Sequence, residues 1–248
     1  MTGDIAFYLL AALAAFTVGL SKGGLPMVGM LGVPLLALSI SPIVAAALLL
    51  PIFVLSDMFG LYVYRRAFDR RNLAILIPAA TLGIAIGWAT ASITREWLVT
   101  LIVGIIGLSY CINALVTRGG GEARSADLPR GVFWGTIAGF TSFVSHSGAP
   151  PYQMYVLPQR LDKMTFAGTS TIFFAVVNAI KLIPYWALGQ FTTGNLKVAA
   201  VLAPVAVAGI FLGFKLVKII PEKAFFRFVE VALAVVSVKL VFDALFKA

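Results

Sequence analysis

Long apolar segments separated by short polar connections run through the whole chain of 248 residues. Most of these segments contain roughly 16 to 24 residues, close to the ~20 residues that an α-helix needs to cross a bilayer. Transmembrane β-strands would instead give short stretches of alternating polarity. The pattern therefore predicts an all-α polytopic membrane protein. The ten predicted segments are 5–20, 25–40, 43–64, 73–92, 97–117, 131–145, 149–159, 165–187, 196–214 and 224–246.

The first two segments of each half are shorter than a full membrane crossing. Segment 5–20 has 16 residues, which as an α-helix would reach about 24 Å, less than the ~30 Å of the hydrocarbon core. Glycine and proline gather at the junction between the two segments in both halves. We interpret each pair as a helical hairpin whose tip lies within the membrane.

The two halves of the chain are related by an internal duplication. Shifting the sequence by 124 residues places residues 16–34 on residues 140–158 with seven identities in nineteen positions. The duplication predicts a first copy over 1–117, a linker over 118–130 and a second copy over 131–248, all within one membrane domain. The identical pairs are Phe16/Phe140, Thr17/Thr141, Ser21/Ser145, Gly24/Gly148, Pro26/Pro150, Met30/Met154 and Pro34/Pro158.

The basic connections indicate that the two copies face opposite ways. Connection 65–71 of copy one contains four arginines, whereas its counterpart 189–195 carries no charge. The next connection reverses this difference, with one basic residue in copy one and three in copy two. Because basic connections favour the cytoplasmic side, we expect an inverted repeat in which each copy is a hairpin plus three transmembrane helices. Both termini are then expected on the non-cytoplasmic side.

Composition agrees with a membrane protein, since 60% of the residues are hydrophobic and the mean hydropathy is +1.00. The net charge of +9 lies mostly in the connections, so it reports membrane topology rather than nucleic-acid binding. One cysteine and one histidine cannot build a disulfide or a multi-ligand metal site, and we expect no metal and no cofactor. The chain has no Gly-x-x-x-x-Gly-Lys-Ser/Thr loop for ATP. We therefore expect no direct use of ATP. Since the chain has one histidine, and Ser145 and His146 are adjacent in sequence rather than positioned by a third group, we also expect a protein that is not an enzyme.

Within the duplicated stretch, Lys22 lies opposite His146, so each copy places a group that can be cationic just before a Gly-x-Pro sequence. A lysine near the bilayer centre is costly unless it is paired or meets a charged ligand. Glycines allow close approach of backbone to a ligand, and a helix start offers N–H groups and a positive dipole end. These features favour a midplane anion site. The predicted substrate-binding residues are Ser21, Lys22, Gly23, Gly24, Ser145, His146, Ser147, Gly148, Gln153 and Asn178.

The third segments add further polar positions. Asp57 of copy one is equivalent to Lys181 of copy two, and Thr171, Asn178 and Lys181 share one helical face. Asp57, Lys181 and His146 are candidates for coupling or gating. His146 in particular could link protonation to anion binding, because the ordinary pKa of a histidine is near ~6.5. Other interpretations stay open. Lys22 could reach the interface, Asp57 and Lys181 could pair with loop charges, the glycines could serve packing alone, and His146 could be structural.

Four sequence runs are distinctive: Gly-Leu-Ser-Lys-Gly-Gly-Leu-Pro (19–26), Met-Leu-Gly-Val-Pro-Leu-Leu (30–36), Gly-Phe-Thr-Ser-Phe-Val-Ser-His-Ser-Gly-Ala-Pro-Pro (139–151) and Leu-Pro-Gln-Arg-Leu-Asp-Lys (157–163). Together they resemble the TauE/SafE family of bacterial sulfite and organosulfonate exporters. The resemblance covers both copies and nearly the whole chain. It implies a carrier in the bacterial cytoplasmic (inner) membrane that moves small sulfur-containing anions, usually outward.

Two function classes fit the sequence. A secondary carrier would open a midplane anion site alternately to each side, whereas an anion or small-solute channel would use the same architecture without alternating access. The expected partners are a small anion, such as sulfite, thiosulfate or a two-carbon sulfonate, and the lipid bilayer. The coupling ion and the oligomeric state, including a homodimer, stay open.

Overall fold

The computed structural model describes residues 5–40, 42–116 and 123–246, and these ranges contain helices and connections but no strand. Every predicted segment contains helix. The first half contains α1 (Ile5–Lys22), the 3-10 helix η1 (Pro26–Leu31), α2 (Gly32–Leu36), α3 (Pro42–Tyr64), α4 (Arg70–Ala89) and α5 (Glu96–Val116). The second half contains α6 (Leu128–Ser145), α7 (Ala149–Val156), the 3-10 helix η2 (Leu157–Gln159), α8 (Lys163–Ala187), α9 (Thr193–Ile219) and α10 (Glu222–Phe246).

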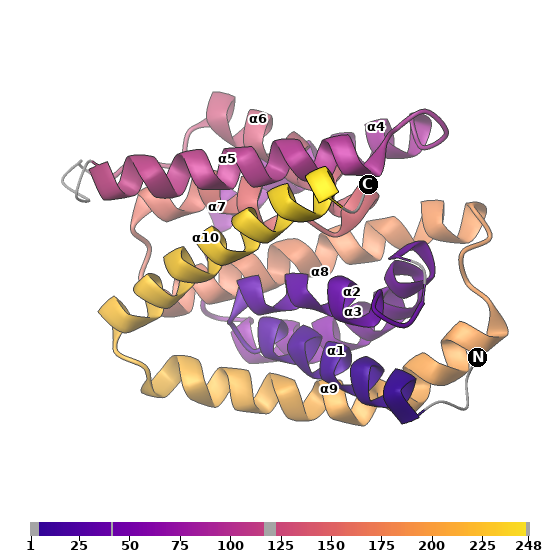
Figure 1. Cartoon of the computed structure of the whole chain (residues 1–248). Coiled ribbons are helices and arrows are strands. Elements are labelled where there is room, and N and C mark those ends of the chain that lie inside the picture. The colour runs from indigo at the N-terminus through magenta and orange to yellow at the C-terminus, as the bar shows by residue number, and fades with distance from the viewer. Residues whose placement is uncertain (1–4, 41, 117–122, 247–248) are drawn as a thin grey trace. The chain divides into compact units, whose positions relative to one another are not determined.

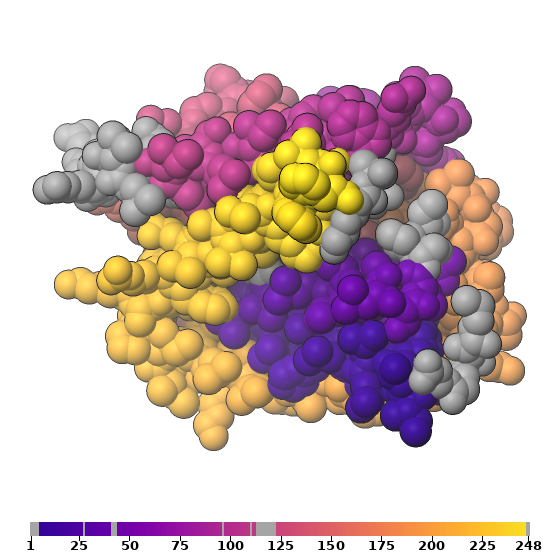
Figure 2. Space-filling model, viewed as in Figure 1, coloured from indigo at the N-terminus to yellow at the C-terminus, as the bar shows by residue number. Residues whose placement is uncertain are grey.

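Five of the described helices, α1, α3, α4, α8 and α9, are long and apolar enough to cross a membrane. Helix α10, yellow in Figure 2, also presents apolar side chains outward, because Val231, Val235, Val238 and Phe242 are each at least half exposed. Such a stripe is unfavourable in water and stable against lipid. The all-α polytopic membrane class is confirmed, whereas the inverted repeat stays a prediction.

Short polar side chains determine where several helices begin. Asp69 accepts a hydrogen bond from the Asn72 N–H at the start of α4, and Asp127 accepts one from the Arg130 N–H at the start of α6. Thr192 caps α9 in the same way. An N-cap satisfies a backbone donor that has no partner within the helix. These caps begin the three helices three residues before the predicted segments.

The structure differs from the predicted segments at two further places. Segment 25–40 is not one continuous helix but η1 followed by the five-residue α2, because glycine and proline interrupt it. Helix α9 continues to Ile219, so Lys215 and Lys218 lie on its last turns rather than in a connection. Lysine is a good helix former and is favoured near a helix C-terminus. Part of the predicted linker, residues 118–122, lies outside the described residues.

The helices form two compact units, and each unit contains helices from both halves of the sequence. Unit one consists of Met1–Phe68 and Ala167–Ile220, and unit two of Asp69–Phe166 and Pro221–Ala248. Each unit therefore has one helical hairpin together with long helices from the other half. This division by contacts is separate from the division into copies, which stays a prediction.

In unit one, α1 lies alongside α9 (Figure 1), and α9 also packs against α3. Glycines bring α1 and α9 into backbone contact, because a Cβ added at Gly19 would overlap the carbonyl oxygen of Ala206. A Cβ at Gly209 would meet the backbone of Phe16 in the same way. The apolar core of the unit then gathers around this helix pair and α3, as Ala14, Ala206 and Leu49 are fully buried.

In unit two, α4 packs against α6 and α5 packs against α10. A Cβ at Gly83 would overlap the carbonyl oxygen of Thr136, and one at Gly139 would overlap that of Ala80. In each unit, the first helix of the hairpin, α1 or α6, thus packs closely against a long helix, α9 or α4, because glycines lie at the contact. Small residues allow the close approach that membrane helices use to associate.

We expect Gly83→Ala to destabilise the protein by about 1–3 kcal/mol, because the added methyl group must separate α4 from α6. Gly194→Ala is the matched control, since only Thr192 Oγ1, at 3.8 Å, lies within 4 Å of its added Cβ. In the control, the higher helix propensity of alanine should be neutral or stabilising by up to about 1 kcal/mol. Thermal unfolding of the purified variants in detergent would measure both. Equal stability of the two variants would contradict the proposed backbone contact.

Candidate functional site

The first helix break lies directly after Lys22, at the end of α1. The Leu25 N–H returns to the carbonyl of Leu20, and Gly24 has φ +116°, a conformation that favours glycine. The Tyr64 hydroxyl, from the last residue of α3, donates to the Gly23 carbonyl at 2.6 Å. The break is therefore held by a specific contact from α3, and Gly24 has no room for a side chain beside Tyr64.

Lys22 is buried, and its charge is paired. Its Nζ lies 2.7 Å from Asp57 Oδ1 in α3, and both side chains are about 95% buried. The rings of Phe53 in α3 and Phe174 in α8 also lie near the ammonium group, with centroids 5.3 and 5.8 Å from Nζ. Such contacts stabilise a cation that has lost its water. Lys22 is therefore held inside the protein rather than exposed at its surface.

Two residues of α8 complete this cluster. Asn178 Nδ2 donates to Asp57 Oδ2 at 2.9 Å, and the fully buried Lys181 acts electrostatically on both Asp57 and Lys22. The structure thus brings together four residues that the sequence singled out, Lys22, Asp57, Asn178 and Lys181, all within unit one. We call these four residues the charge cluster. Its formal charge is one net positive when all three ionisable groups are charged.

Buried hydroxyl groups lie on the same helices as the cluster. The side-chain oxygens of Ser56 in α3 and of Ser170 and Thr171 in α8 are buried without a hydrogen-bond partner among the described residues. Thr171 is close to the α1 break, because a Cβ added at Gly60 would meet both Thr171 and the Lys22 carbonyl. An unpaired buried hydroxyl is unfavourable unless a ligand or water satisfies it. Sequence reasoning missed Ser56 and Ser170, since a serine within an apolar helix carries no positional signal.

The three serines predicted to bind substrate make local hydrogen bonds. Ser21 donates to the carbonyl of Val18, Ser145 to that of Thr141, and Ser147 to that of Ser145. Each hydroxyl group therefore already donates its proton to a nearby backbone carbonyl. An anion could take these donors only if the hydroxyl groups rotated.

The second helix break, in unit two, has a different construction. His146 ends α6 in the left-handed conformation, with φ 54° and ψ 21°, and the Ser147 N–H returns to the Thr141 carbonyl. Glycine is the usual residue at such a C-terminal position. A non-glycine residue held in this region is a strained feature of the kind found at functional sites.

Helix α7 starts at this break and carries Gln153. Gly148 is its N-cap and provides no side-chain hydrogen bond, while Pro150 and Pro151 have no N–H to offer. The N-terminus of α7, which the sequence predicted to bind an anion, therefore offers few free N–H groups. Gln153 is fully buried, and neither its Nε2 nor its Oε1 has a hydrogen-bond partner among the described residues. An amide in this state is available to a ligand.

Lys22 belongs to unit one and His146 to unit two. The sequence predicted that the two helix breaks build one anion site. That joint site stays a prediction.

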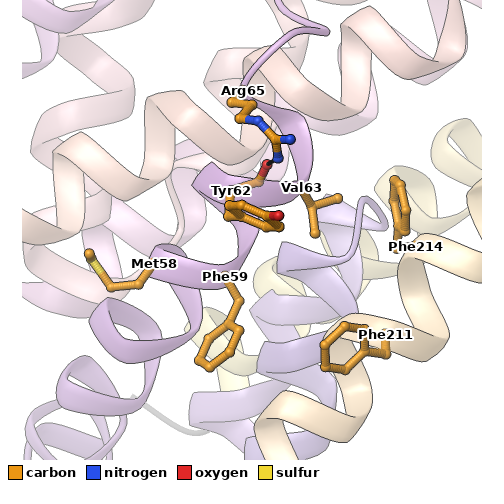
Figure 3. A pocket seen from close by; sticks show the side chains of 7 residues that line it. All are labelled: Met58, Phe59, Tyr62, Val63, Arg65, Phe211 and Phe214. Carbon is orange, nitrogen blue, oxygen red and sulfur yellow. Dashed lines mark hydrogen bonds between the residues drawn. The ribbon is translucent and has the colours of Figure 1, made fainter.

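Unit one also has an apolar groove of about 750 Å³ between α3 and α9, shown in Figure 3. It is lined by Met58, Phe59, Tyr62, Val63, Arg65, Phe211 and Phe214. The Arg65 guanidinium stacks on the Tyr62 ring at 4.2 Å and donates to the Tyr62 carbonyl. A groove of this composition offers an oxyanion few free donors, so the charge cluster is the better candidate for an anion site.

The fold and the charge cluster together define an all-α polytopic membrane protein with a buried cluster of ionisable groups beside a broken helix. A family model described as sulfite exporter TauE/SafE matches residues 10–240. The chain belongs to this family, which consists of membrane transporters, as its sequence runs indicated. Comparisons with curated proteins and with solved structures gave no significant match.

The left-handed conformation of His146 gives a stability prediction. We expect His146→Gly to raise the stability by on the order of 1 kcal/mol, because glycine adopts this backbone without strain. His146→Ala keeps the strain and should show no such gain. Melting temperatures of both variants in one detergent would measure the difference. If His146→Gly melts no higher than His146→Ala, the left-handed backbone at this position carries no strain and the prediction is wrong.

Proposed function

We propose that this protein is a secondary carrier that exports small sulfur-containing anions, such as sulfite, thiosulfate or two-carbon organosulfonates. The observation that carries the proposal is the charge cluster, which places the ionisable groups of two lysines and one aspartate inside the membrane domain of a sulfite-exporter family member. Buried ionisable groups of this kind mark ion and substrate pathways. The site would open alternately to each side of the membrane.

The roles follow from the chemistry of each group. Lys22 would supply the charge that attracts the anion, while Asn178 and Thr171 would supply neutral donors beside it. Gly23 and Gly24 would let the ligand approach the backbone. Asp57 and Lys181, which act on each other electrostatically, would respond to the ligand's charge and so serve coupling.

We propose that the corresponding residues of the second helix break also contribute to anion binding, within unit two. His146 would supply a titratable group, and Gln153 an amide with both polar atoms free of hydrogen-bond partners. Ser145, Ser147 and Gly148 adjoin His146 and would contact the ligand after local rearrangement, as Ser21 would in unit one.

The carrier would work in the cytoplasmic membrane of a bacterium. With the basic connections inside, both termini lie on the non-cytoplasmic side. Small oxyanions cannot cross hydrocarbon unaided, because an unpaired charge is strongly disfavoured there. A buried site with fixed positive charge removes this barrier.

Ligand binding should stabilise the purified protein by mass action. At a concentration of 100 times Kd, thiosulfate or a sulfonate should add about 2.7 kcal/mol to the unfolding free energy. The double variant Lys22→Met/Asp57→Asn removes both charges of the ion pair together, which avoids leaving a buried charge unpaired, and should show no stabilisation. Thermal shift measurements with a panel of sulfur oxyanions would test this. If no anion in the panel stabilises the wild type, the proposed substrate class is wrong.

Transport in proteoliposomes should distinguish a carrier from a channel. Vesicles loaded with unlabelled thiosulfate should accumulate labelled thiosulfate transiently above equilibrium, because an alternating site exchanges one anion for another. Uptake should also saturate with concentration. A channel would only equilibrate the label, and that result would favour the channel function over the carrier.

A further inference from the structure

Within the charge cluster, the carboxylate of Asp57 is already paired with Lys22, the cation that we propose binds substrate. Asp57 Oδ1 lies 2.7 Å from Lys22 Nζ, a distance that fits a carboxylate with an ammonium group. The second oxygen of Asp57 accepts from Asn178. An anion that approaches Lys22 therefore meets a negative carboxylate that holds two of the most suitable donors.

The charges that face Asp57 come from two of the helices in unit one. Lys22 approaches from α1 and Lys181 from α8, and both act electrostatically on Asp57. Helix α9 packs against α3 and carries Lys197, Lys215 and Lys218, but these side chains are exposed. The sequences of η1 and α2 contain no ionisable residue. Among the described residues of these helices, the charges that act on Asp57 are therefore those of Lys22 and Lys181.

The formal charge of the cluster discriminates between two types of anion. With Lys22, Lys181 and Asp57 ionised, a monoanion brings the buried site to neutrality. A dianion brings it to one net negative charge. Net charge in a buried site is unfavourable, and protonation of Asp57 would return the dianion complex to neutrality. It would also release Lys22 and Asn178 for the ligand.

We propose that binding of a dianion such as thiosulfate is coupled to the uptake of one proton by Asp57, whereas binding of a sulfonate monoanion is not. This inference rests on the proposed anion site at Lys22, and it adds the coupling ion and the charge of the substrate. The proton moves from solvent onto an Asp57 carboxylate oxygen, and the Lys22–Asp57 ion pair becomes a Lys22–substrate ion pair. Transport of a dianion would then carry a proton with it.

The test compares two ligands that do not titrate between pH 6 and 8, thiosulfate and methanesulfonate, on the purified full-length protein. Titration calorimetry in two buffers of different ionisation enthalpy counts the protons taken up. We expect about one proton per thiosulfate and about none per methanesulfonate. The thiosulfate Kd should then rise about tenfold per pH unit above neutrality, the slope that linkage of one proton requires. The methanesulfonate Kd should stay nearly constant.

Variants locate the proton. Asp57→Asn mimics the protonated carboxyl, so it should bind thiosulfate with a Kd that no longer depends on pH. The exposed Lys197→Gln in α9 is the matched control and should keep the tenfold slope of the wild type. Persistence of the slope in Asp57→Asn, or its loss in Lys197→Gln, would assign the proton elsewhere and overturn the inference.

The wild type alone also decides the question, should Asp57→Asn not fold. Thiosulfate binding without proton uptake would overturn the coupling but leave the anion site intact. Failure of both ligands to bind would instead overturn the proposed function, and the inference with it.

Discussion

The ion pair between Lys22 and Asp57 is the interaction on which the arrangement of unit one depends. A buried ammonium group without a partner would be strongly unfavourable in an apolar interior, so α1 can end inside the protein only if α3 brings its carboxylate to the same place. The 2.7 Å contact and the Tyr64 hydroxyl on the Gly23 carbonyl fix the end of α1 against α3. The position of the helix break follows from charge neutralisation.

Close helix packing makes this geometry attainable. Helices in lipid gain little from burying apolar side chains, so they associate through backbone contact at small residues. Gly19 and Gly209 bring α1 against α9 in unit one, and Gly83 and Gly139 bring α4 against α6 in unit two. Each first hairpin helix is thereby held along its length, although it carries a break at its end. Rigid support of this kind lets a broken helix present a charge without losing its position.

The sequence predicted the helical segments well and the side-chain contacts only in part. Hydropathy and glycine–proline junctions located every helix, but the caps at Asp69 and Thr192 moved the starts of their helices. Lys22 was recognisable because a lysine within apolar sequence needs a partner. Its partner was not recognisable, since Asp57 lies on another helix, 35 residues further along the chain, and only packing brings the two together.

A carrier of the proposed kind must also be stable when its site is empty, and this requirement would explain an acidic residue inside the proposed anion site. A lysine without a counter-ion would hold the empty state at a high free energy, or bind the anion too tightly to release it. Asp57 stabilises Lys22 in the absence of substrate, and Asn178 holds the carboxylate through its second oxygen. In the proposed carrier, the free energy gained when substrate binds would then be a difference between two ion pairs. A small difference of this kind permits release on the other side of the membrane.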